Sequence, residues 1–252
     1  MEIAVMLAIV CIHEMGHLFM AMYLKWRIRR IMLWIFGGVM ETEEHGNRPI
    51  AEEALVVLAG PLQHLFIYLL LLGFGESLLP ASVLDIAFQY NIILLLFNLL
   101  PIYPLDGGKL LSLVLASVMP YRRAHAATLI FSICCGIVLL VIQLLYFSFV
   151  LTTVCLIGFL LVENRLEWKQ RYYVFLRFLL KRNELPSFPM TTIQAHKKDR
   201  LIDILSLFRR NRLHRIQSKD EGWIISEEAL LAKYFSERNH SKTFAEIPTV
   251  KK

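Results

Sequence analysis

The chain has 252 residues, of which 56% are hydrophobic and only 19% are charged, and its mean hydropathy is +0.53. This composition is too apolar for an ordinary soluble domain of that length, so it favours a membrane protein. The formal net charge is +6, but the basic residues lie beside apolar runs and in the last third of the chain. That distribution is typical of membrane topology and argues against direct nucleic-acid binding.

Apolar runs long enough to cross a bilayer alternate with short polar segments along the first two thirds of the chain. One crossing takes about 20 apolar residues. The runs at 3–24 and 54–74 are followed by a third at 86–100, which is broken by Pro101, Pro104 and Asp106 and resumes as a helix to Met119. The stretch at 124–162 is nearly free of charge and would be about 58 Å long as a helix, or about two crossings. We therefore predict a polytopic α-helical protein with five spans and a turn near 146–152.

The short loops support this layout, because loops rich in Lys and Arg remain on the cytoplasmic side. Basic residues at 25–30, at 48, at 122–123 and from 165 onward fall on one side, and the loop at 75–85 on the other side has no Lys or Arg. This places the C-terminal region in the cytoplasm. A proline break at membrane depth must be satisfied by protein or by cavity water, so the break after residue 100 indicates a functional site.

The composition becomes polar from about residue 185, and Pro186 and Pro189 indicate a linker. Beyond it, strand-like pieces at 215–217 and 222–225 alternate with helical pieces at 199–209 and 227–234. We predict a transmembrane domain over 1–165, a linker over 166–190 and a small α/β domain over 191–252.

The first apolar run contains the motif His-Glu-x-x-His, formed by His13, Glu14 and His17. Histidines at i and i+4 share one face of a helix and can bind one Zn²⁺, and a glutamate beside the first of them can act as the general base. The pattern arises by chance in roughly one in a hundred chains of this length. However, three ionisable groups in mid-membrane are costly and by default indicate function. We therefore interpret the two histidines as zinc ligands.

A catalytic zinc ion needs a third protein ligand, and Asp106 is the intramembrane candidate. Gly107 and Gly108 follow it and would allow backbone and metal to approach closely. Counted as helix, His17 lies about 12 Å from the basic segment that begins at 25, and Asp106 lies about 21 Å from the loop at 120. Both depths are measured from the same face, so a shared metal ion is geometrically possible. The alternative role for Asp106 is a helix N-cap.

Two further intramembrane polar residues are less specific. Asn98 lies eight residues before Asp106, where its amide could orient a substrate carbonyl or stabilise an oxyanion, or make an interhelical hydrogen bond. His64 follows a Gly-Pro-Leu-Gln segment, and we expect a structural or ligand-supporting role for it.

Residues 13–17 and the segment from Asn98 to Gly107 resemble the two signatures of the site-2 protease family of intramembrane metalloproteases, His-Glu-x-x-His and Asn-x-x-Pro-x-x-x-x-Asp-Gly. The segments at 37–38, 43–49 and 59–64 look like one branch of that family, which occurs in spore-forming bacteria. The resemblance implies that Asp106 is the third zinc ligand and that 191–252 is a CBS-type regulatory domain. That branch has six spans, so its first helix is expected to be absent from this chain.

The resemblance also implies an activity and a setting. It implies a zinc metalloendopeptidase in the membrane around the forespore, which cleaves the pro-sequence of the sporulation factor pro-sigma-K. It further implies inhibition by partner membrane proteins and ATP binding by the cytoplasmic CBS-like domain. Assembly into a homo-oligomer is a separate possibility that the sequence leaves open.

The predicted mechanism uses Zn²⁺ held by His13, His17 and Asp106, with zinc hydroxide attacking the scissile carbonyl. Glu14 takes the proton and returns it to the leaving amine. The β-prone segment at 31–46 could hold the unwound substrate by strand addition. Two alternatives remain open: the same enzyme class acting on transmembrane anti-sigma factors, and a membrane metal transporter, for which intramembrane His and Asp are equally expected.

Overall fold

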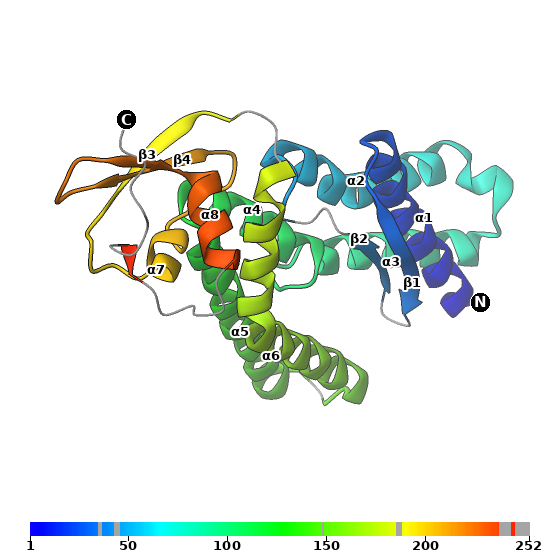
Figure 1. Cartoon of the computed structure of the whole chain (residues 1–252). Helices are drawn as coiled ribbons and strands as arrows, with labels where there is room; N and C mark the ends of the chain where they lie inside the picture. The colour runs from blue at the N-terminus through cyan, green and yellow to red at the C-terminus, as the bar shows by residue number, and fades with distance from the viewer. Residues whose placement is uncertain (35–36, 43–45, 148, 185–187, 237–242, 245–252) are drawn as a thin grey trace. The chain divides into compact units, whose positions relative to one another are not determined.

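The computed structural model describes residues 1–34, 37–42, 46–147, 149–184, 188–236 and 243–244. The chain divides into two compact units, and Figure 1 shows the elements of both. Unit 1 contains Met1–Leu113 and Thr128–Arg165, and unit 2 contains Val114–Ala127 and Leu166–Lys252. The described residues are mostly helical.

In the first two thirds of the chain, the described residues form six helices and one β-hairpin. Three of these helices begin directly after a proline (Pro49, Pro80 and Pro120), a residue that disfavours the helical conformation in the residue before it and so separates successive helices. The elements are α1 (Glu2–Tyr23), β1 (Ile28–Trp34), β2 (Gly37–Thr42), α2 (Ile50–Leu78), α3 (Ala81–Asn98), α4 (Asp106–Val118), α5 (Tyr121–Tyr146) and α6 (Leu151–Leu180).

Four helices in the described residues, α1, α2, α3 and α5, are long and apolar enough to cross a membrane. The turn expected near 146–152 is present, since α5 ends at Tyr146 and α6 begins at Leu151. However, α6 is not among the candidate spans, because its apolar segment is followed by Glu163 and Arg165. The prediction of five spans is therefore not confirmed.

The surface of α2 has the polarity expected for a lipid environment. Leu62, Phe66 and Leu69 are exposed, whereas Gly60 and His64 are buried. A soluble helix buries its large apolar residues and exposes its polar ones, so this arrangement is inverted. It follows that α2 presents apolar side chains to lipid and keeps its polar residues inside the protein.

In unit 1, α1 packs against α2 and α3 (Figure 1). One contact cluster joins Ile9 of α1, Ile67 and Leu71 of α2 and Ala87 of α3. Nearer the site, α1 and α2 approach so closely that a Cβ atom at Gly16 would lie 2.5 Å from the backbone oxygen of Ala59. Any larger residue at position 16 would separate the two helices.

The segment after α1 forms an antiparallel β-hairpin. Strand β1 pairs with β2 from Ile28, opposite Thr42, to Trp34, opposite Gly37. The β-prone segment expected at 31–46 therefore forms strands over its described part, and 35–36 and 43–45 lie outside the described residues.

Unit 2 contains a three-stranded sheet with strand order β3-β4-β5, in which β3 and β4 are parallel and β4 and β5 are antiparallel. Its elements after α6 are a 3-10 helix (Lys181–Glu184), β3 (Met190–Ala195), α7 (Leu201–Leu205), β4 (Leu213–Ser218), β5 (Ile224–Ser226) and α8 (Glu227–Ser236). The strand-like pieces predicted at 215–217 and 222–225 fall on β4 and β5. The predicted helix at 199–209 is shorter than expected.

The core of unit 2 joins the second half of α6 to the sheet and its helices. Phe175 and Phe178 of α6 pack in one buried cluster with Leu205, Phe208 and other residues of the C-terminal segment. Residues 166–180 of the predicted linker are therefore helical and contribute to this core. The domain boundaries themselves stay a prediction.

A buried polar cluster links α8 to β4 in unit 2. Arg182 pairs with Glu227 through two nitrogens, and the backbone N–H of Arg209 donates to Nε2 of His214 at 3.2 Å. The other ring nitrogen of His214 therefore carries the hydrogen and donates to Oε2 of Glu227 at 3.1 Å. The imidazole is thus held neutral beside an ionised carboxylate.

We expect unit 2 to lose stability as the pH falls below about 6.5, the ordinary pKa of histidine. Burial lowers the pKa of His214, because the imidazolium would lose its hydration. Burial alone would raise the pKa of Glu227, but hydrogen bonds from His214 and Arg182 hold it below its ordinary value. Both groups bind more protons in the unfolded state, so their contributions are complete above the unfolded pKa and decline below it, by about 1.4 kcal/mol per pH unit and group.

Hydrogen exchange of the β4 amides in the intact, detergent-solubilised protein, corrected for intrinsic exchange rates, measures this effect. Protection at pH 5.5 should be lower than at pH 7.5, and His214→Gln, which does not titrate, should reduce the difference. Equal protection at the two pH values would contradict the prediction.

Candidate metal centre

The two histidines of the His-Glu-x-x-His motif lie one helical turn apart on the buried face of α1. A helix places residues i and i+4 above one another, and this spacing brings the Nε2 atoms of His13 and His17 to 3.2 Å. Their surroundings are dry, since His13 is 3% exposed and His17 is 6% exposed.

Asp106 is the first residue of α4, and its Oδ2 atom completes the cluster. This oxygen lies 3.2 Å from Nε2 of His13 and 3.1 Å from Nε2 of His17. The structure therefore brings together the three residues that the sequence predicted as ligands.

Hydrogen bonds from α5 and α6 fix the loop that carries Asp106. The backbone N–H of Tyr103 donates to Oγ of Ser132 at 2.8 Å, and the amide of Asn164 donates to the backbone oxygen of Tyr103. The peptide bond between Tyr103 and Pro104 is cis. All these groups belong to unit 1, so the buried polar residues of α5 and α6 determine where Asp106 lies.

Glycines allow the start of α4 to pack directly on this loop. A Cβ atom at Gly107 would lie 2.1 Å from the backbone oxygen of Leu99, and one at Gly108 would lie 2.4 Å from the backbone nitrogen of Tyr103. Contacts this short between a Cβ and backbone atoms cannot be relieved by a side-chain rotation. The two glycines after Asp106 are therefore required by the packing of the loop.

Gly60 of α2 forms the floor of the centre. A Cβ atom at this position would lie 2.2 Å from Nε2 of His17 and 2.7 Å from Cε1 of His13. Only a glycine backbone leaves room for both imidazole rings at this point of the α1–α2 contact.

The three donor atoms fit a tetrahedral zinc ion. The sides of their triangle measure 3.2, 3.2 and 3.1 Å, and ligand atoms at Zn–N and Zn–O distances of about 2.0–2.1 Å in tetrahedral geometry lie about 3.3 Å apart. The ring of His17 is also correctly oriented, because its Nδ1 lies 2.8 Å from the backbone oxygen of Val56. A carbonyl oxygen only accepts, so Nδ1 carries the hydrogen and Nε2 retains its lone pair for a metal.

The remaining polar residues surround this triangle. The carboxylate of Glu14 lies near the histidines, with the three ligand-type atoms of His13, Glu14 and His17 within 4.8 Å of one another. Nζ of Lys109 lies 3.2 Å from Oδ1 of Asp106, the oxygen that does not face the histidines. Asn98 is the half-buried last residue of α3, and in the described part of the chain its side chain makes no hydrogen bond to the triangle.

Sequence reasoning missed the roles of Val56, Gly60 and Lys109. Lys109 could have been found, because a basic residue one turn after Asp106 on a helix lies on the same face. The other two act through the crossing of α1 and α2. No spacing within a single helix indicates such a contact.

Comparison with known proteins places this arrangement in a family. The family model for Peptidase family M50 matches residues 1–79 and 76–143. Stage IV sporulation protein FB of Bacillus subtilis is 36% identical over 251 residues, which cover 96% of this chain and 86% of that protein. The chain belongs to peptidase family M50. As an M50 peptidase it is an intramembrane zinc metalloprotease of the site-2 type, and this membership favours the protease over the metal transporter.

Two matches from Methanocaldococcus jannaschii extend the comparison. A zinc metalloprotease of Methanocaldococcus jannaschii is 30% identical over 119 residues, which are 46% of this M50 chain and 34% of that protein. The solved site-2 protease structure from Methanocaldococcus jannaschii superposes with a TM-score of 0.53 at 24% identity, over 65% of this chain and 76% of that chain. At this identity the similarity shows a shared fold.

Proposed function

We propose that His13, His17 and Asp106 hold the catalytic zinc ion of this intramembrane metalloprotease. The near-equilateral triangle of their donor atoms carries the proposal. When bound there, Zn²⁺ supplies Lewis-acid polarisation of the scissile carbonyl and lowers the pKa of a water molecule. Glu14 accepts a proton from that water as general base and delivers it to the leaving amine. Asn98, at the end of α3, donates its amide hydrogen to a substrate carbonyl.

Replacing Asp106 by Ala is expected to reduce the zinc content of the purified protein from one ion per chain towards none, because two histidines alone do not complete the site. Metal analysis of detergent-solubilised protein measures this. Asp85→Ala, which changes an exposed carboxylate on α3, is the matched control and should retain zinc. Undiminished zinc in the Asp106 variant would place the third ligand elsewhere.

We propose that the substrate is the pro-sequence of the sporulation factor pro-sigma-K. The 36% identity to a stage IV sporulation protein over nearly the whole chain supports a sporulation substrate, and a transmembrane anti-sigma factor is the alternative. The β1–β2 hairpin supports binding of an unwound peptide, since a two-stranded sheet can accept a further strand. Co-expression with each candidate, followed by mapping of the new terminus, tests the proposal. Cleavage of an anti-sigma factor alone would favour the alternative.

We propose that the protease lies in the membrane around the forespore. We also propose that inhibitory membrane proteins are its partners and that it can assemble into a homo-oligomer. The predicted orientation places the C-terminal domain in the cytoplasm, with α6 as the fifth span. The basic residues that follow the apolar part of α6, from Arg165 onward, support this side.

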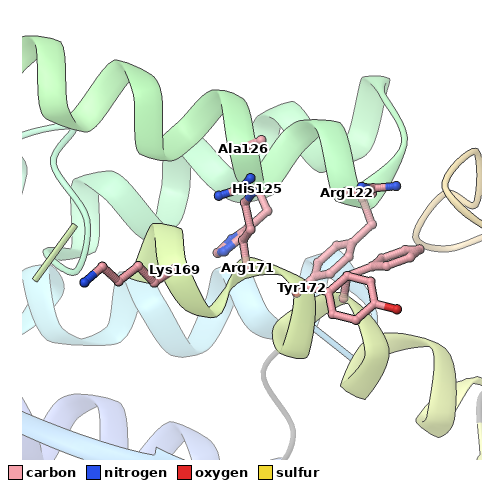
Figure 2. A pocket seen from close by; sticks show the side chains of 8 residues that line it. Arg122, His125, Ala126, Lys169, Arg171 and Tyr172 are labelled. Atoms are coloured by element: carbon pink, nitrogen blue, oxygen red, sulfur yellow. The ribbon is translucent and has the colours of Figure 1, made fainter. Parts of the chain in front are cut away.

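We also propose that 191–252 is a CBS-like regulatory domain. The ATP expected at this domain is proposed to bind in a neighbouring part of unit 2, outside 191–252, because the pocket there is lined by residues of α5 and α6. The order strand, helix, strand, strand, helix from β3 to α8 supports such a domain. A pocket of about 230 Å³ within unit 2 supports an anionic ligand (Figure 2). Arg122, Lys169 and Arg171 offer charge to phosphates, and the rings of Tyr121, Tyr172 and Phe175 offer apolar surface; His125 and Ala126 complete the lining.

Reversing the charge at Lys169 in this pocket is expected to weaken ATP binding to the intact protein. Lys169 lines the pocket on the side opposite Arg122, with His125 and Arg171 between them (Figure 2), so replacing its cation by a carboxylate should weaken binding about tenfold. Equilibrium binding of ATP to Lys169→Glu measures this. Arg177→Glu, which changes an exposed cation on α6 that does not line the pocket, is the control. Equal affinity in both variants would locate the nucleotide elsewhere.

A further inference from the structure

Behind the metal triangle, His64 of α2 is clamped by Asn91 of α3. Nδ1 of His64 lies 2.8 Å from Oδ1 of Asn91, and Nδ2 of Asn91 donates to the backbone oxygen of His64 at 2.9 Å. Both residues are deeply buried, with 1% and 2% of their surface exposed. Because two hydrogen bonds join the same two residues, the imidazole is held in one orientation.

The clamp also determines which nitrogen of His64 carries the hydrogen. The backbone oxygen can only accept, so the amide nitrogen of Asn91 must face it, and the amide oxygen must face Nδ1. Nδ1 of His64 therefore carries the hydrogen, and Nε2 retains a lone pair. Nε2 is buried and has no hydrogen-bond partner among the described residues.

A matching donor lies in the neighbouring ring. Nε2 of His13 faces Asp106 and His17, so metal binding through Nε2 requires the hydrogen of His13 on Nδ1. Nδ1 of His13 is also buried and without a hydrogen-bond partner in the described part of the chain. A buried donor and a buried acceptor that are both left unpaired destabilise the folded protein, so a bond between them is favoured.

The separation of the two rings suits a direct bond. The ring centroids of His13 and His64 lie 5.0 Å apart, and the ring planes are inclined by 49°. Two imidazoles joined in plane by an N–H···N hydrogen bond of about 3 Å have centroids roughly 5 Å apart. At the observed separation of the two rings, they are therefore close enough for this bond.

We propose that His64 is a positioning residue for zinc, whose Nε2 accepts a hydrogen bond from Nδ1 of His13 while Asn91 fixes its tautomer. The inference rests on the proposed ligation of zinc by His13. The two metal-binding imidazoles then have different outer partners: His17 donates to the backbone oxygen of Val56, and His13 donates to a side chain. A side chain can be replaced and a backbone oxygen cannot, so the hydrogen bonds that join Asn91, His64 and His13 can be tested by mutation.

Three variants test these hydrogen bonds. The zinc affinity of each is measured by competition with a chelator on the purified intact protein. His64→Leu removes the acceptor and should weaken zinc binding about 10- to 100-fold. His64→Gln retains an amide oxygen that can accept from His13 and should recover most of this loss. Asn91→Leu leaves His64 in place but releases its tautomer, so it should also weaken zinc binding; this variant keeps the test valid where His64→Leu fails to fold.

Thermal stability of the zinc-free protein separates positioning from packing. If His64 only fills space, Leu should be tolerated at least as well as Gln in this buried site, in stability and in zinc affinity alike. Zinc affinity that is equal for the Leu and Gln variants, or unchanged by His64→Leu, overturns the proposal. His13→Ala separates a failure of the proposed zinc ligands from a failure of the hydrogen-bond network. Retained zinc in His13→Ala overturns the ligand set. Loss of zinc in His13→Ala together with normal zinc affinity in His64→Leu overturns only the hydrogen bond from His13 to His64.

Discussion

Replacing Glu14 by Gln is expected to reduce cleavage of a co-expressed substrate by about 10²- to 10⁴-fold while zinc stays bound. The side chain is half-buried beside His13 and lies outside the triangle of donor atoms. Gln has the same size but cannot accept a proton, so the variant removes the general base and leaves the proposed ligands in place.

Immunoblotting of the cleaved substrate and metal analysis of the purified variant measure the two halves of this result. Glu76→Gln, which changes an exposed glutamate near the end of α2, is the control for the loss of one carboxylate from a membrane helix and should cleave normally. Full activity of the Glu14 variant would exclude Glu14 as the base.

Replacing Gly60 by Ala is expected to remove zinc and to reduce cleavage by at least about 100-fold, because a misplacement of about 1 Å in a catalytic group has that effect. The added methyl group would lie 2.2 Å from Nε2 of His17 and 2.4 Å from its Cε1. The clash is with the metal-facing atoms themselves, so it can be relieved only by moving the ring or by separating α1 from α2.

Gly73→Ala is the matched control, since Gly73 lies on the same helix and its added Cβ would meet nothing within 4 Å. Both variants gain the same helix propensity, so a difference between them in zinc content reports the contact with His17. Normal zinc content in the Gly60 variant would show that α1 and α2 tolerate a larger separation than the described packing allows.

The part of the site that lies within one helix could be predicted from the sequence. The spacing of His13 and His17 determines that both face the same side of α1, and Glu14 follows from that motif. Asp106 required a comparison of depths across the membrane, counted from basic residues predicted on the same face, and the structure places its carboxylate beside both histidines. Gly60 and the Asn91–His64 clamp could not be predicted, because they depend on how α2 packs against its two neighbours.

The fold could also be predicted in part. Apolar runs identified α1, α2 and α5, and the turn between α5 and α6 was expected because 39 uncharged residues exceed one crossing. The composition did not predict the full length of α6. This helix continues past Glu163 to Leu180, and its second half packs in a core like that of a soluble protein. Hydropathy alone could not indicate that a polar continuation remains helical when aromatic residues such as Phe175 and Phe178 pack against another segment.

His17 and Asp106 are 89 positions apart in the sequence, and this separation has a consequence for the synthesis of the protein. At synthesis rates of about 5–20 residues per second, the ribosome needs roughly 4–18 s to pass from one ligand to the other. During that interval, α1, α2 and α3 emerge into the membrane with His13, Glu14 and His17 but without the carboxylate of Asp106. On the proposed ligand set, the nascent chain is therefore not yet competent to cleave neighbouring membrane proteins, and competence begins only after α4 has emerged and the loop before it has packed on α5 and α6.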